Sequence, residues 1–296
     1  MKQATHVEPQ WNLQDLEPSD RYGWSAVVRN SLPLVALLTL APLLAARSIA
    51  AAWSLAPLIG LFLYRITIVM HDHTHGTLFR SSRLNTWVGQ LLGAMTGIDF
   101  RRFKSQHWKH HRLYGQLGDP QGFHYLGIQR LNRPQFAWHL IKPIFGANLR
   151  HVLPESLLYP PNLWRALRRG HVAIALAVQL AMFLVVTGGA RYLTLAFLPF
   201  ASAATFGLFF SQIRGLAEHG SLDSGKAGYV RSHASRALER ILLYDLHFNY
   251  HAVHHRWPHC PSRHLPLIHD RYFAAQAPLE RSMIGTVIAI GTRLSS

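Results

Sequence analysis

Residues 49–70, IAAAWSLAPLIGLFLYRITIVM, run without a break into residues 71–75, HDHTH. The first part is apolar and about as long as a membrane-crossing helix, which needs roughly 20 such residues. If the helix continues past its apolar part, His71 and His75 lie on one face of it, about one turn beyond the membrane core. This stretch therefore predicts a membrane helix that presents two imidazoles just outside the bilayer.

Two more segments carry clustered histidines, HWKHH at residues 107–111 and HAVHH at residues 251–255. On a helix, residues three or four positions apart share a face, so each segment would aim its imidazoles in one direction. A single histidine near an apolar run is usually a packed core residue, but three such clusters indicate a metal centre. Imidazole binds metal in its neutral form. The eight candidates are His71, His75, His107, His110, His111, His251, His254 and His255.

Four apolar runs predict four transmembrane helices in two hairpins, at about residues 31–46, 49–70, 171–190 and 192–213. We expect residues 1–30 to form a polar N-terminal segment and residues 31–296 a single integral membrane domain. The first 30 residues are too acidic for a cleavable secretory signal, with Glu8, Asp15, Glu17 and Asp20. Arg65, inside the second run, is expected to reach toward the membrane edge.

The distribution of basic residues predicts the orientation. Residues 101–170 contain 12 Lys and Arg and residues 214–296 contain 10, whereas each hairpin tip has one, Arg47 or Arg191. Because cytoplasmic segments are enriched in basic residues, both large polar segments and both termini should face the cytoplasm. The predicted fold is therefore an all-α, multi-pass membrane protein whose cytoplasmic helical cap carries every histidine cluster.

The composition narrows the possible partners and metals. The chain has 30 Lys and Arg against 14 Asp and Glu, a formal charge of +16, which is typical of contact with nucleic acid or an anionic membrane. The long apolar runs favour the membrane, and no nucleic-acid module is present in the sequence. With one cysteine, Cys260, the chain has no thiolate cluster, so a metal must be held by nitrogen and oxygen.

The fourth apolar run leads into His219, six residues after Ile213, which makes a ninth candidate ligand. Nine imidazoles exceed the three protein ligands of a catalytic zinc and suit two metal ions. An all-nitrogen shell is compatible with iron, copper, zinc or nickel. Carboxylates close in sequence could orient the rings, and Asn249 could contribute an oxygen or hold a bridging water. The carboxylates are Asp72, Glu218 and Asp245, for which an ordinary solvated role is equally open.

At this point the sequence resembles a known family. HDHTHG followed by LFRSSRLN, HWKHH with a trailing GDP, and NYHAVHHRWP ahead of PSRHLP are similar to the three histidine boxes of membrane fatty acid desaturases and of related hydroxylases and carotenoid ketolases. The resemblance covers about residues 50–270. It implies a di-iron centre held by the box histidines and His219, and O2-dependent oxidation of an acyl or similar lipid chain. The HxxxH spacing of the first box favours a substrate other than an acyl-CoA, and Val253 replaces an acidic residue or glutamine found in many relatives.

Desaturation is the principal expectation, with hydroxylation or carotenoid ketolation as the alternative of the same chemistry. No flavin, nicotinamide or haem motif is present in the sequence, so electrons should come from a separate ferredoxin- or cytochrome-like donor. The basic residues beside the second box could attract that donor or could hold anionic lipid. They are Arg101, Arg102, Lys104, Lys109 and Arg112. A zinc-dependent membrane hydrolase is an alternative of another class, whereas a metal transporter would need ligands inside the membrane.

Overall fold

The structure is a computed structural model that describes residues 16–168, 172–222, 229–234, 236–275 and 277–295. Within these residues every regular secondary-structure element is a helix, and β-pairing is limited to two isolated bridges. The all-α expectation is confirmed. The longer helices are α1 (Asp20–Ala45), α3 (Ala56–His75), α4 (Ser82–Thr96), α5 (Phe100–Leu113), α9 (Val172–Val186), α11 (Leu208–His219) and α15 (Met283–Thr292). The shorter ones are α2 (Ile49–Trp53), α6 (Arg133–Ile141), α7 (Leu149–Val152), α8 (Pro160–Arg168), α10 (Leu198–Ser202), α12 (Ala237–Leu242), α13 (His251–Arg256) and α14 (Leu265–Ile268).

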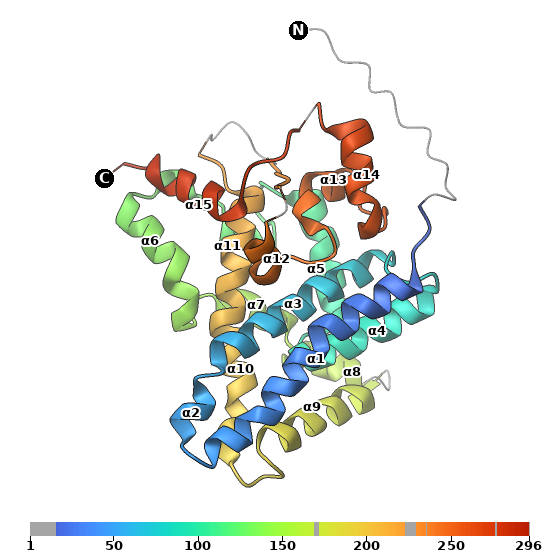
Figure 1. The fold of residues 1–296 in the computed structure, drawn as a ribbon, viewed down its shortest axis with the longest axis vertical. Coiled ribbons are helices and arrows are strands. Elements are labelled where there is room, and N and C mark those ends of the chain that lie inside the picture. Colours follow the sequence, from blue (N-terminus) through green and yellow to red (C-terminus); the bar gives the residue numbers. More distant parts are fainter. Residues whose placement is uncertain (1–15, 169–171, 223–228, 235, 276, 296) are drawn as a thin grey trace.

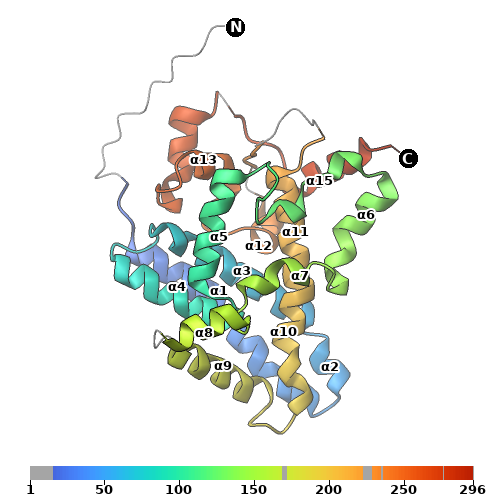
Figure 2. The ribbon, with the colours of Figure 1, turned by 180° about the vertical axis from the view of Figure 1, so that it is seen from behind.

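Helix α3 occupies the centre of the fold. It packs against α1, α4, α5, α10 and α11, and most of its residues from Ile59 to His75 are buried. Figure 1 shows α2, α9 and α10 at one end of the molecule and α5, α13 and α14 at the other, and Figure 2 shows the same arrangement from behind. The helix therefore connects an apolar end of the molecule to the end that carries the second and third histidine clusters.

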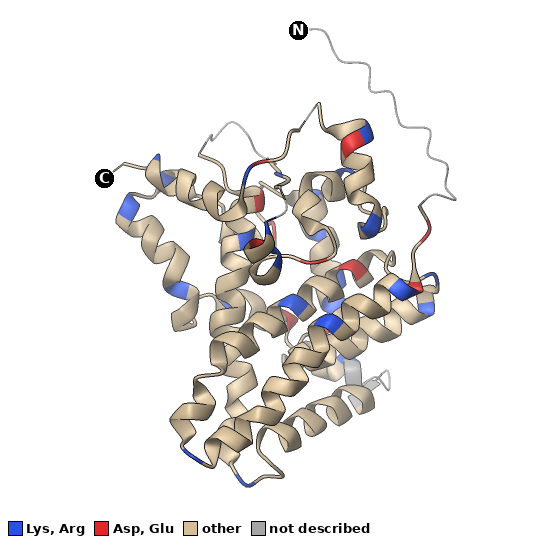
Figure 3. Cartoon of the chain, viewed as in Figure 1, with Lys and Arg blue, Asp and Glu red and all other residues tan. Residues whose placement is uncertain are grey.

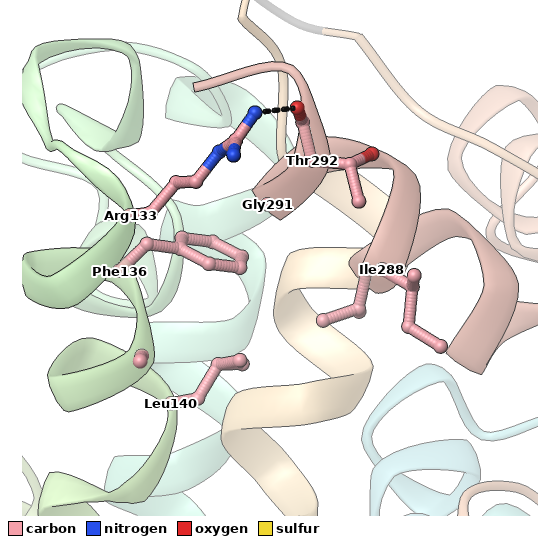
Figure 4. Close-up of a pocket in the computed structure, with 8 residues that line it drawn as sticks. Arg133, Phe136, Leu140, Ile288, Gly291 and Thr292 are labelled. Atoms are coloured by element: carbon pink, nitrogen blue, oxygen red, sulfur yellow. Dashed lines mark hydrogen bonds between the residues drawn. The ribbon is translucent and has the colours of Figure 1, made fainter. Parts of the chain in front are cut away.

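Charged side chains are distributed unevenly between these two ends. Figure 3 shows Lys, Arg, Asp and Glu gathered around α5, α12, α14 and the first turns of α1, while the ribbon of α2, α9 and α10 is almost free of them. Three helical stretches are long and apolar enough to cross a membrane, at Asp20–Ala45, Ile49–His75 and Leu193–His219. The apolar end thus fits a bilayer.

The helix boundaries differ from the expected spans. Helix α1 begins well before residue 31, because the Ser19 hydroxyl caps it by accepting the amide of Tyr22 at 3.4 Å. Helix α9 has 15 residues, fewer than the roughly 20 that cross a membrane, and the positive φ angles of Gly188 and Gly189 follow it. Within the described residues the fold thus has three span-length apolar stretches and two shorter apolar helices, α9 and α15. His171, where the third span was expected to begin, lies outside the described residues.

The expectation that Arg65 reaches toward the membrane edge is wrong. Its guanidinium is buried and donates to Asp245 Oδ2 at 2.9 Å and to Asn30 Oδ1 at 2.8 Å. Arg29 donates to the same carboxylate at 2.7 Å. This buried network ties α1 and α3 to the loop before the third histidine cluster, which no local pattern could indicate because Arg65 and Asp245 are far apart in sequence.

Helix α3 and the stretch that contains α10 and α11 approach each other closely at Gly60. A Cβ atom at this position would lie 2.5 Å from the Ser202 carbonyl oxygen and 2.7 Å from Phe206 Cβ. The contact falls where the second stretch changes to a π-helical turn, Ala203–Gly207. Beyond it both helices continue to a histidine, His75 on α3 and His219 on α11.

Candidate metal centre

The first cluster occupies the last turns of α3. This helix ends at Gly76, whose φ of +74° is the left-handed conformation that glycine adopts readily at a helix C-terminus. His71 and His75 are four residues apart and both rings are buried. His73 points elsewhere, with its Nδ1 3.2 Å from Asn85 Oδ1. The helical spacing thus separates two candidate ligands from the histidine between them.

The second cluster lies on α5. The Asp99 carboxylate starts this helix by accepting the amides of Arg101 and Arg102 at 2.9 and 3.0 Å. The ring centroids of His107 and His111 are 4.5 Å apart, whereas the ring of His110 lies 4.9 Å from that of His219 on α11. One helix can therefore supply ligands to two neighbouring positions.

The third cluster forms the short helix α13, which follows a tight turn in which His247 has a φ of +60°. The ring centroids of His251 and His255 are 4.5 Å apart, whereas the ring of His254 lies 4.8 Å from that of His71 on α3. His219 comes from the end of α11, and its Nε2 lies 2.9 Å from His251 Nε2. The structure thus joins the ninth predicted histidine to the third cluster.

All nine predicted histidines gather into two adjacent groups. The five-histidine group consists of His71, His75, His107, His111 and His254, and the four-histidine group of His110, His219, His251 and His255. Within each group one candidate ligand atom per residue lies within 4.8 Å of the others. The groups adjoin, since the ring centroids of His111 and His255 are 4.4 Å apart. Their role as metal ligands stays a prediction.

The spacing of the ring nitrogens suits metal ions better than hydrogen bonds. His107 Nε2 lies 2.8 Å from His75 Nε2 and 2.9 Å from His111 Nε2. One ring nitrogen has either one proton or one lone pair, so it cannot make both contacts as ordinary hydrogen bonds. Two nitrogens at about 2.1 Å from one ion and at right angles to each other would be separated by roughly 3 Å. The observed contacts match that arrangement.

Burial keeps these imidazoles in the form that binds metal. Desolvation lowers the pKa of His111 to about 3, and it lowers the pKa values of His107, His251, His254 and His255 well below their usual value. Both ring nitrogens of His71 and of His255 are buried without a hydrogen-bond partner. Buried polar atoms normally have a hydrogen-bond partner, so nitrogens without one are what a metal-binding site would present. The donor set therefore fits two metal ions.

Sequence reasoning missed Asp119, a carboxylate that contacts the four-histidine group. Its Oδ1 accepts from His110 Nδ1 at 2.9 Å, and its Oδ2 accepts from the hydroxyl of Tyr125. Burial would raise the pKa of Asp119, but hydrogen bonds from His110 and Tyr125 keep it below its usual value. A carboxylate on Nδ1 fixes the ring so that Nε2 is free to bind metal. The Gly-Asp-Pro sequence at residues 118–120, which follows the second cluster, was the feature that could have indicated this carboxylate.

Glu218 is the one predicted carboxylate that approaches a candidate ligand in the described part of the chain. Its Oε2 is 3.4 Å from His251 Nε2, and its Oε1 accepts from Arg214 Nε at 2.7 Å. Glu218 is buried beside His219. The arginine holds one carboxylate oxygen and leaves the other directed at the four-histidine group.

The other three predicted supporting residues contact other partners. Asp72 accepts from Thr77 at 2.9 Å and from Ser262 at 2.7 Å, which links α3 to the segment after the third cluster. Asp245 accepts from the two arginines described above. Asn249 donates to the His233 carbonyl at 2.8 Å. Each is buried, and these contacts support the backbone that carries the histidines, not the rings themselves.

The fold and the site define a helical protein with apolar helices long enough to cross a membrane and two histidine groups that could hold metal ions. A sequence model described as fatty acid desaturase matches residues 47–286, and the chain belongs to this family. The expected family is confirmed.

The curated relatives include enzymes of two activities. A beta-carotene 4-ketolase from Protosiphon botryoides is 26% identical over 211 residues, 70% of this chain and 48% of the relative. An sn-1 acyl-lipid omega-3 desaturase (ferredoxin) from Synechocystis is 27% identical over 106 residues, 36% of this chain and 27% of the relative. A sphingolipid delta(4)-desaturase from Bos taurus is 24% identical over 218 residues, 69% of this chain and 60% of the relative.

The chain spans about half of the first of these relatives and just over half of two ketolases from Haematococcus lacustris, 58% of each. No solved structure matches it.

Proposed function

We propose that the chain is a membrane di-iron oxidoreductase that uses O2 to oxidise an acyl or similar lipid chain, with desaturation as its principal reaction. The observation that carries this proposal is the gathering of nine histidines, from four separated parts of the sequence, into two adjoining buried groups. Family membership supports an oxidoreductase. Nine nitrogen donors in two groups suit a pair of metal ions and exceed the three protein ligands of a catalytic zinc.

Each part of the chain has a definite task in this proposal. When bound, two irons would supply the reduction of O2 and the removal of hydrogen from an unactivated C–H bond. The neutral imidazoles would hold the ions, with Asp119 fixing the ring of His110. Seven of the nine histidines are buried, which would keep bulk water away from the reacting atoms, and His111 and His255 are half-buried. Asp72 would hold the end of α3 against the segment after the third cluster, and Asp245 would hold the loop before that cluster against α1 and α3.

Ketolation of a carotenoid is the second candidate. The relatives support it, because the Protosiphon ketolase matches 70% of this chain, about as much as the Bos taurus sphingolipid desaturase at 69%. Removal of a second hydrogen gives a double bond, while transfer of oxygen to the carbon gives an alcohol, and a second oxygen transfer to the same carbon followed by loss of water gives the ketone. A small change in substrate position decides between these outcomes, so the metal ligands are common to both.

We further propose that the protein is multi-pass, with the histidine groups and both termini on the cytoplasmic side. The long apolar helices and the basic excess in residues 101–170 and 214–296 support this orientation. The substrate would enter from the bilayer, and two electrons per turnover would come from a separate carrier protein. The name of the Synechocystis relative specifies ferredoxin, which supports such a carrier.

The test combines metal analysis with product analysis. The purified full chain is expected to contain two irons, and a host making both unsaturated lipids and β-carotene is expected to gain a new double bond in its lipids relative to an empty-vector control. A ketone on the carotenoid would instead establish the second candidate. One zinc per chain and no oxidised product would replace both with the hydrolase.

A further inference from the structure

Trp108 connects the five-histidine group to the outside of the protein. Its indole ring lies 4.9 Å from the ring centroid of His75 and 5.7 Å from that of His111. The indole N–H donates to the carbonyl of Thr74 at 3.4 Å, which holds the ring against the end of α3. Trp108 is thus in contact with two candidate ligands without belonging to either histidine group.

On its other side Trp108 contacts His259, at a centroid distance of 5.3 Å. His259 is exposed and Trp108 is half-buried, whereas His75 is buried. His111 is the one half-buried member of the five-histidine group. The rings of His259, Trp108 and His75 therefore form a row of contacts from the surface to this group.

The helix that carries Trp108 also carries positive charge on the same face. Lys104 and Arg112 are four residues before and four residues after Trp108, which places them on its side of α5, and both are exposed. Residues 100–113 contain no acidic residue, and Figure 3 shows α5 in blue and tan only. An acidic partner would be attracted to this face.

We propose that Lys104, Trp108, Arg112 and His259 form the docking surface for a small acidic one-electron carrier protein, and that Trp108 is the bridge through which its electrons reach the five-histidine group. Each docked carrier would lose one electron and the metal would gain it, with no bond made or broken. Two such transfers supply the two electrons that one turnover needs. This proposal rests on the proposed function, because it needs a redox-active metal in that group.

The principal test compares two reductants on the iron-loaded full chain, followed by stopped-flow absorbance. Trp108→Leu is expected to lose most of the reduction rate with reduced [2Fe–2S] ferredoxin and to keep the wild-type rate with dithionite. Trp108→Phe keeps a ring in place and is expected to keep most of the ferredoxin rate. Trp87→Leu, which removes a 57% exposed tryptophan of α4, is the control and should change neither rate.

The second test concerns docking. The double variant Lys104→Glu, Arg112→Glu is expected to lower the second-order rate with ferredoxin by about tenfold at low salt. The difference should shrink as salt screens the charges. Arg130→Glu, at an exposed position of the 3-10 turn Ile128–Arg130, is the control and should retain the wild-type rate.

These experiments separate failure of the docking proposal from failure of the proposed function. If Trp108→Leu, with its full iron content, is reduced by ferredoxin at the wild-type rate, the bridge is wrong. If the double variant loses binding to anionic vesicles while its ferredoxin rate is unchanged, the face is a lipid contact and the docking site is wrong. If the wild-type chain binds no iron, the proposed function itself fails.

Discussion

The two histidine groups differ in their surroundings more than in their number of rings. In the described part of the chain, carboxylates contact only the four-histidine group, through Asp119 on His110 and Glu218 near His251. The five-histidine group has one more nitrogen but no carboxylate contact among the described residues, while both groups contain buried Nδ1 atoms without a hydrogen-bond partner. A carboxylate compensates part of the charge of a bound cation. Two neighbouring ions would therefore be held in different ways, one by an extra imidazole and one by negative charge.

The largest expected effect comes from removing one ring from each group. His254→Ala and His110→Ala should both abolish product formation, because the proposed reaction needs both ions. The iron contents should differ, since the first variant leaves four nitrogens in its group and the second leaves three. We expect the greater iron loss in His110→Ala, measured by mass spectrometry of the metal.

Membrane insertion is the control for both variants and should be unchanged. Full activity in either variant would remove that residue from the ligand set. Equal iron loss would mean that ring number does not distinguish the two groups.

The second-largest effect is a loss of stability that should release iron equally from both histidine groups. Asp245→Ala leaves the buried Arg65 without its carboxylate, and breaking a buried ion pair in this way costs about 3–5 kcal/mol of stability. Because Asp245 contacts neither group, we expect a lower thermal unfolding temperature in detergent and parallel iron loss from both. Glu17→Ala breaks an exposed pair with Arg80 and should have little effect.

The third effect should be confined to the four-histidine group. Asp119→Ala removes the partner of His110 Nδ1, and loss of such a partner typically costs about 10–100-fold in metal affinity or activity. Iron binding to the variant should become biphasic, with one ion bound as in the wild type. Asp270→Ala is a matched control, because Asp270 is an exposed aspartate that contacts His269 Nδ1 at 3.1 Å outside either group. Equal weakening of both irons in Asp119→Ala would contradict the proposed difference.

The smallest effect is expected at His73, which lies between two candidate ligands but belongs to neither group. His73→Gln should alter only its hydrogen bond with Asn85, at a cost of about 1 kcal/mol in stability. Iron content and product formation should be retained. Loss of an iron from this variant would show that the division into two groups is incomplete.

Helical spacing was sufficient to predict which histidines gather. His71 and His75, or His251 and His255, are brought together by the geometry of a single helix, and the apolar runs placed those helices at one end of the molecule. The division into two groups could not be predicted, because it depends on how α3, α5, α11 and α13 are rotated relative to one another. That rotation arises from packing between distant residues.

The same limit explains the missed and incorrect assignments. Asp119 lies in a loop nine residues after His110, where no helical period relates the two. Arg65 lies inside an apolar run, which suggests that it reaches toward the membrane edge. Its actual partner, Asp245, is 180 residues away, so no local pattern reveals it. The length of α9 was overestimated because hydropathy continues through residues that end the helix, among them the two positive-φ glycines. Local patterns therefore predicted which histidines gather, but not which residues lie next to them.

The close approach at Gly60 has a mechanical consequence. Helix α3 ends in two members of the five-histidine group and α11 ends in a member of the four-histidine group, and both helices start from the apolar end of the molecule. Because Gly60 has no side chain, the two helices approach more closely there than a residue with a Cβ atom would permit. A methyl group added at Gly60 would wedge α3 away from the π-helical turn, and the displacement would be passed along both helices to the histidines at their ends.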